Sequence, residues 1–145
     1  ELNFDVLRCI DGAVQYPIIF ELAFEGRIQM VACYKRPSEV DASQWVCSDY
    51  FASSWQSVNA PRQTLPVMLD LVALYESLLR SIIPLAARPQ EKLVDLVLRL
   101  NKFNTLQRDI QKTQIQLAKE KQFNRKVGIN AQLREIKTEL EELSR

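Results

Sequence analysis

The C-terminal part of the chain has almost no residues that interrupt a helix. From Glu91 to the end of the sequence there is no proline and one glycine, Gly128. Apolar residues recur there at spacings of three and four, which places them on one face of an α-helix. They form two stripes: Leu93, Leu96, Leu100, Phe103, Leu106, Ile110 and Leu117, then Ile129, Leu133, Ile136, Leu140 and Leu143. This pattern predicts a long helical extension.

The two stripes fall out of register across "AKEKQFNRK", residues 118–126. A single straight helix would turn one apolar face away from the other at that point. We therefore favour two antiparallel helices joined by a turn near residues 118–125. One continuous helix of roughly 50 residues is the alternative, because neither glycine nor proline marks a turn there.

The N-terminal part mixes helix and strand signals. "FDVLRCIDGAV" has helical spacing and predicts a short helix over residues 5–13, capped by Asp5. "IIFELAF" and "RIQMVACY" are rich in β-branched and aromatic residues and flank Glu25-Gly26, which predicts a hairpin over residues 17–35. In this register Phe20 pairs with Val31, and Glu21 pairs with residue 30. Both faces are mostly apolar, so we expect the hairpin to be central and covered on both sides.

The next segments complete an α+β body. "QWVCSDYF" predicts a third strand, antiparallel to the second, and residues 52–65 read as a loop. Pro66 suits a first helical position, and "VMLDLVALYESLLRSII" is apolar nearly all round, which predicts a buried helix ending before Pro84. The predicted fold class is therefore α+β: a small antiparallel sheet of about three strands packed with helices in residues 1–88. Residues 89–145 follow as a helical hairpin or coiled-coil-like extension.

Composition excludes several kinds of active site. The sequence has no histidine, so it cannot form Ser-His or Cys-His nucleophile pairs or histidine metal sites. Cys9, Cys33 and Cys47 lie in apolar runs. We expect all three to be small buried side chains, kept as free thiols by a reducing cytosol. No signal peptide or membrane-spanning stretch is visible, so we expect a cytoplasmic protein. Because residue 1 is Glu, we expect the natural chain to begin further upstream.

One pair of residues resembles part of a nuclease site. Glu21 and Lys35 lie on the two arms of the predicted hairpin, as do the acid and lysine of PD-D/E-x-K nucleases. Position 33, where that motif needs a second carboxylate, is cysteine, a poor ligand for Mg²⁺. In the predicted register Lys35 also points to the face opposite Glu21, although a bulged turn would reverse this. We interpret the stretch as structural and keep Glu21 and Lys35 as weak catalytic candidates, with no metal and no cofactor expected.

Positive charge is concentrated in the helical extension. Residues 1–90 carry 7 Lys/Arg and 10 Asp/Glu, whereas residues 91–145 carry 12 and 8. Such a segment is either a solvated helix face or a surface that contacts nucleic-acid phosphates. The candidates are Arg99, Lys102, Arg108, Lys112, Lys119, Lys121, Arg125 and Lys126. We expect Phe103 and Phe123 within this stretch to pack in the helical seam.

Several segments together resemble a known prokaryotic family. They are "VLRCIDGAVQYPIIFEL", "ACYKRP", "VCSDYF", "LPVMLDLVALYESLLRSIIPL" and "EKQFNRKVGINAQLREIKTELEEL". The chain resembles the domain-of-unknown-function family four-three-nine-one over essentially its whole length. Members of that family are longer at the N-terminus and more often have a charged helix former where this chain has Gly128. Their genes tend to lie beside DNA methyltransferases and helicases of restriction–modification or phage-defence clusters.

The resemblance implies an accessory role in DNA processing and offers no catalytic residues. We therefore expect a non-catalytic interaction module that binds a partner protein, such as a methyltransferase or helicase subunit, nucleic acid, or both. A degenerate or incomplete PD-D/E-x-K nuclease domain is the alternative. The sequence does not define the oligomeric state.

Overall fold

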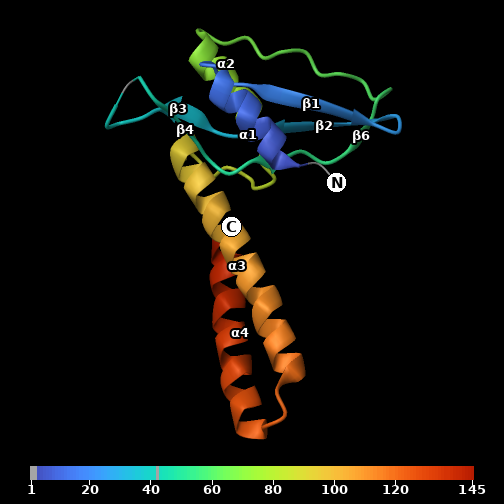
Figure 1. Ribbon diagram of the computed structural model, residues 1–145, viewed down its shortest axis with the longest axis vertical. Helices are drawn as coiled ribbons and strands as arrows, with labels where there is room; N and C mark the ends of the chain where they lie inside the picture. The colour runs from blue at the N-terminus through green and yellow to red at the C-terminus, as the bar shows by residue number, and fades with distance from the viewer. Residues whose placement is uncertain (1–2, 42) are drawn as a thin grey trace. The chain divides into compact units, whose positions relative to one another are not determined.

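The computed structural model describes residues 3–41 and 43–145, which form two compact units, Glu1–Pro84 and Leu85–Arg145 (Figure 1). The N-terminal unit combines helices with short antiparallel strands, and the C-terminal unit is helical. The predicted α+β class, with a small antiparallel sheet and long C-terminal helices, is confirmed.

The first helix, α1 (Phe4–Ala13), begins one residue before its expected cap at Asp5. The side chain of Asn3 accepts a hydrogen bond from the Asp5 amide at 2.9 Å and caps the helix. The predicted Asp5 cap is wrong, because Asp5 lies inside the first turn and pairs with Arg8 at 3.0 Å. Leu7 and Asp11, one turn apart, are the buried residues of this helix.

Strands β1 (Ile19–Phe24) and β2 (Arg27–Ala32) form the predicted antiparallel hairpin. Glu25 and Gly26 both have positive φ, 47° and 72°, as a tight two-residue hairpin turn requires. The predicted register is confirmed: Phe20 pairs with Val31, and Glu21 pairs with Met30.

The environment of this hairpin differs from the prediction. Strands β5 (Phe51–Ala52) and β6 (Gln56–Ser57) both pair with the far side of β2, so β2 is central and β1 lies at the edge. Val31 on β2 is fully buried, whereas Phe24 on β1 is 60% exposed. The prediction that the hairpin is central and covered on both faces is therefore correct for β2 and wrong for β1.

The predicted third strand divides into two. Its first part, β4 (Trp45–Cys47), pairs with β3 (Lys35–Pro37) in a separate two-stranded sheet. Its second part, β5, pairs antiparallel to β2 as expected. The chain changes sheets around Ser48, whose hydroxyl accepts a hydrogen bond from the Tyr34 amide at 2.8 Å and replaces a strand-to-strand bond.

Helix α2 (Leu71–Ile82) begins five residues after the predicted start at Pro66. Asp70 caps it by accepting a hydrogen bond from the Ala73 amide at 2.8 Å. The expected burial is also wrong. Leu79 and Ile82 are buried, but the apolar residues of the start and the preceding turn are exposed, including Leu69 and Leu71.

Helices α3 (Leu93–Lys119) and α4 (Phe123–Ser144) form an antiparallel hairpin within the C-terminal unit (Figure 1). The turn lies inside the predicted range, and the single-helix alternative is wrong. Glu120 explains how the chain turns without glycine or proline: its side chain accepts hydrogen bonds from the Lys121 and Gln122 amides, both at 2.8 Å. Buried seam residues come from both stripes, among them Leu96 and Leu133.

Candidate functional site

The two weak catalytic candidates have different partners. Glu21 lies on the surface, where its Oε1 is 2.9 Å from Nη2 of Arg62. It lines one side of a groove of about 620 Å³ that also contains Met30 and Leu78. Lys35 is only 3% exposed and pairs with Asp11 of α1. The described geometry does not assemble Glu21 and Lys35 into a nuclease-like pair.

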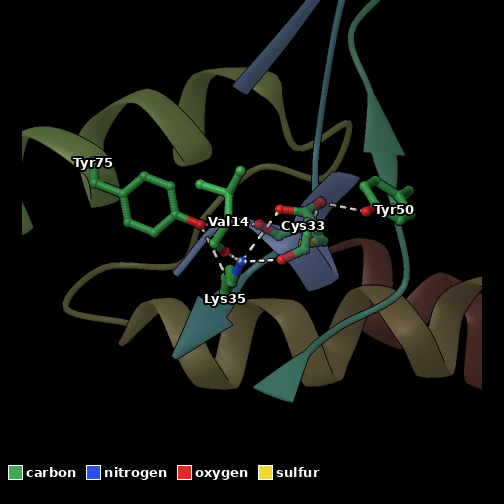
Figure 2. A network of polar contacts seen from close by, with 6 residues as sticks. Val14, Cys33, Lys35, Tyr50 and Tyr75 are labelled. Carbon is green, nitrogen blue, oxygen red and sulfur yellow. Dashed lines mark hydrogen bonds and ion pairs between the residues drawn. The ribbon is translucent and has the colours of Figure 1, made fainter. Parts of the chain in front are cut away.

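Lys35 joins the start of β3 to the end of α1, as Figure 2 shows. Its Nζ donates hydrogen bonds to the backbone carbonyls of Asp11 and Val14, both at 2.5 Å, and lies 3.6 Å from Asp11 Oδ1. Carbonyl groups at the C-terminal end of a helix lack helical partners and carry partial negative charge. The ammonium group therefore neutralises both the helix end and the buried carboxylate.

The other oxygen of Asp11 binds neutral donors. The Tyr50 hydroxyl donates a hydrogen bond to Asp11 Oδ2, and the Cys33 sulfur lies 3.6 Å from the same oxygen. Burial raises the pKa of the Cys33 thiol, and the negative charge of Asp11 raises it further. Burial and the hydrogen bond to Asp11 likewise raise the pKa of Tyr50. Both groups remain protonated at neutral pH, so Cys33 is not a thiolate nucleophile.

Tyr75 connects α2 to this cluster. Its hydroxyl donates to the Cys33 carbonyl at 2.9 Å and accepts from the Lys35 amide at 3.2 Å (Figure 2). Burial raises the pKa of Tyr75, although the hydrogen bond from the Lys35 amide opposes this change. The hydroxyl therefore satisfies two backbone groups between β2 and β3.

This cluster connects α1 and α2 to the strands. Its hydrogen bonds and its ion pair have a structural role. Within residues 3–41 and 43–145, no three His, Cys, Asp or Glu side chains are grouped so that they could hold a metal ion. The role of Asp11 was missed in the sequence. The sequence signal for this role is the four-residue spacing between Leu7 and Asp11, which places the carboxylate on the buried face of a short helix. A buried carboxylate needs a cationic partner.

The expectation of three buried cysteines is wrong for two of them. Cys33 is buried, whereas Cys9 and Cys47 are exposed, and all three are free thiols. Cys9 lies on the exposed side of α1, and Cys47 lies on the short strand β4, every residue of which is exposed.

Arg99, the first candidate of the basic stretch, is buried inside the helical hairpin. Its guanidinium group binds both carboxylate oxygens of Glu91 at 2.8 Å and donates to the carbonyls of Leu143 and Ala86, both at 2.6 Å. The hydrogen bonds from Arg99 lower the pKa of Glu91 to about 2. Arg99 is therefore a structural residue that joins the start of α3 to the end of α4, and its expected place on a phosphate-binding face is wrong.

The next three basic candidates are exposed, and each has an ion pair or a hydrogen bond with another residue of the helical hairpin. Lys102 pairs with Glu139 of α4 at 2.6 Å, and Lys112 lies 3.7 Å from Asp109. Arg108 donates through Nε to the Asn104 carbonyl at 3.2 Å. Surface pairs of this kind are weak and exchange readily for other anions.

The remaining candidates gather where α3 turns into α4. We define the hairpin tip as residues 112–126. Lys112, Lys119 and Lys121 line a hollow of about 610 Å³, together with Ile115, Gln116, Glu120 and Gln122. The tip contains five basic residues and one acid, a formal charge of +4. The acid, Glu120, accepts the two amide hydrogen bonds of the turn, and these hydrogen bonds lower its pKa.

The last two basic residues closely follow an exposed aromatic residue in the chain. Arg125 lies 4.0 Å from Glu120, and Lys126 is half-buried. Phe123, expected in the seam, is 78% exposed because it opens α4, before the seam that begins at Ile129. Phe103 is half-buried. The structure thus brings Lys112, Lys119 and Lys121 together on one hollow, and it exposes Phe123 two residues after Lys121.

No helix in the described part of the chain has both the length and the apolar character needed to cross a membrane. A search of the curated proteins and a search of the solved structures returned no match. The family model described as "Domain of unknown function (DUF4391)" matches residues 1–140. The chain therefore belongs to this domain-of-unknown-function family, as its sequence segments indicated.

Proposed function

We propose that the protein is a non-catalytic accessory module whose helical hairpin binds nucleic acid through the hairpin tip. The observation that carries this proposal is the convergence of Lys112, Lys119 and Lys121 on one hollow, with Arg125 and Lys126 nearby. Within the described chain, no acidic side chain forms an ion pair with Lys119 or Lys121. These cations are therefore available to a polyanion.

Binding to phosphates releases counterions and is favourable without any base-specific contact. A positively charged turn at the end of two packed helices offers such contacts on a rigid support. Arg99 is excluded from the proposed interface because it is buried. Lys102 and Arg108 lie outside the tip and are not part of the proposed interface.

The cellular setting is proposed from the family resemblance. Gene neighbourhoods of restriction–modification or phage-defence systems fit a cytoplasmic accessory protein that acts on DNA together with a methyltransferase or helicase subunit. The positive hairpin tip supports the nucleic-acid part of this proposal.

Charge reversal tests the proposed interface. Lys119→Glu combined with Lys121→Glu should weaken binding of a labelled DNA and reduce its log–log salt slope by roughly 0.7–0.9 for each lost contact. The matched control is Lys92→Glu combined with Lys137→Glu, which changes the net charge equally at exposed sites away from the tip. Equal weakening by both pairs, or no binding of any nucleic acid at low salt, would refute the proposal.

A second surface favours protein contact. Residues 65–72 contain Leu65, Val67, Leu69, Leu71 and Val72, each at least two-thirds exposed. Several exposed apolar side chains in one short segment are a feature of protein–protein interfaces. We propose that this segment binds the partner subunit. Leu69→Asp should then abolish co-purification with that subunit when the two proteins are expressed together. Retained co-purification would move the partner site elsewhere.

We propose no catalytic role for Glu21 and Lys35, since each has a different partner. The direct test is incubation of the protein with plasmid DNA and Mg²⁺ or Mn²⁺. Cleavage that disappears in Glu21→Ala would overturn this part of the proposal.

A further inference from the structure

The hairpin tip carries an exposed phenylalanine, Phe123, next in the chain to the residues that line the basic hollow. Phe123 directly follows Gln122, which lines that hollow, and opens α4. The ring is 78% exposed, and within the described residues no other aromatic ring stacks on it. A single exposed apolar residue is ordinary, so exposure alone does not identify a site.

The surroundings of Phe123 are what point to a ligand. Lys119 and Lys121 precede it, and Arg125 and Lys126 follow it. Val127, one helical turn after Phe123 and just beyond the tip, is also exposed, at 54%. An exposed aromatic ring within four residues of four cations offers a stacking surface and phosphate contacts in one short stretch of chain.

We propose that the hairpin tip binds single-stranded nucleic acid, with one base stacked on Phe123 and neighbouring phosphates held by the tip lysines. This inference rests on the proposed function and adds to it the kind of nucleic acid. In a duplex each base face is covered by its neighbours, whereas an unpaired strand exposes base faces that can stack on aromatic side chains. Lysines alone would bind both forms through their phosphates, so the ring supplies the preference for single strands.

The test compares a labelled oligothymidine of ~15 nucleotides with a duplex of the same length, a size suited to a small single-strand site. Fluorescence anisotropy on the full chain should show tighter binding of the single strand. Phe123→Leu, which keeps an apolar side chain without a π face, should weaken single-strand binding by about tenfold and change duplex binding by less than about twofold. Phe24→Leu is the matched control because Phe24 is 60% exposed in the N-terminal unit, and it should change neither affinity.

A second measurement reports stacking directly. Phe123→Trp should retain single-strand binding, and its added fluorescence should be quenched on binding, beyond any change in the parent protein, which has Trp45 and Trp55. Far-UV circular dichroism of each variant checks that the helices are intact. An RNA oligomer of matching length determines whether the 2′-hydroxyl affects affinity.

The outcomes separate this inference from the proposed function. If the protein binds single strands and duplexes equally and Phe123→Leu has no effect, the stacking inference is wrong while the proposed nucleic-acid function stands. If no nucleic acid binds at low salt, both are wrong. Loss of single-strand binding in Phe123→Leu with duplex binding retained supports both.

Discussion

Glu91→Gln should destabilise the helical hairpin, by an amount that depends on pH. In the native protein Glu91 holds the buried guanidinium of Arg99 through two hydrogen bonds of 2.8 Å and also accepts from the Arg88 amide at 2.9 Å. The glutamine has nearly the same size but no charge. Arg99 would then remain buried with the carbonyls of Ala86 and Leu143 and without a counter-ion.

The magnitude follows from the pKa of Glu91. The folded protein lowers this pKa from 4.5 to about 2, and each unit of pKa difference corresponds to about 1.4 kcal/mol. The ionised carboxylate therefore contributes about 3 kcal/mol to the free energy of unfolding. Because the folded pKa is depressed, this contribution is fully present above pH 4.5 and is lost as the pH falls toward 2.

Urea unfolding followed by far-UV circular dichroism measures this effect. Glu91→Gln should lower the free energy of unfolding by about 3 kcal/mol at neutral pH and by much less near pH 2, where about half of the native carboxyl groups are protonated. The control is Glu139→Gln, which removes an exposed partner of Lys102 and should cost less than about 1 kcal/mol.

Two results would refute this reasoning. A cost below that of Glu139→Gln at neutral pH would mean that Glu91 is not the counter-ion on which Arg99 depends. An equal cost of Glu91→Gln at neutral pH and near pH 2 would mean that the loss comes from packing and not from charge.

Three further predictions concern stability, each measured by urea or thermal unfolding. Gly128→Ala should stabilise α4 by about 0.5–1 kcal/mol, because the glycine is within the helix and an added Cβ would meet no atom within 4 Å; a destabilised variant would contradict this. Lys35→Met should cost about 3–5 kcal/mol because it leaves the Asp11 carboxylate buried and unpaired, and the cost should shrink in Lys35→Met combined with Asp11→Leu. Leu79→Ala should cost about 3–5 kcal/mol and Leu69→Ala almost nothing, since the first side chain is fully buried and the second fully exposed; similar costs would argue against the burial pattern.

Local signals predicted the hairpins well. Glu25-Gly26 defined the β1–β2 turn because positive φ at both positions leaves few alternatives, and the register of Phe20 and Val31 followed from it. The two apolar stripes of the C-terminal unit predicted a break near Glu120, where a change of register cannot be accommodated in one straight helix.

The remaining features depend on partners that are distant in sequence, so local sequence signals did not predict them. The start of α2 was placed too early because Pro66 is compatible with a helix start, whereas the cap at Asp70 decides it. The burial of Arg99 could not be read from a basic stretch, since it depends on Glu91 and on carbonyls at the far end of α4. The exposure of Phe123 depends on where the turn ends, and the turn is set by hydrogen bonds to one side chain, Glu120.

The pair formed by Asp11 and Lys35 also has an evolutionary consequence. Both side chains are 2% exposed, so replacing either one alone leaves an uncompensated charge in the interior. Such a loss is a large fraction of the stability of a small domain, so a lineage that changes one position is under strong selection to change the other. In related sequences these two positions should therefore vary together, as acid and cation or as two apolar residues. A family member that keeps only one of these two charges would need a different partner for it near the end of α1.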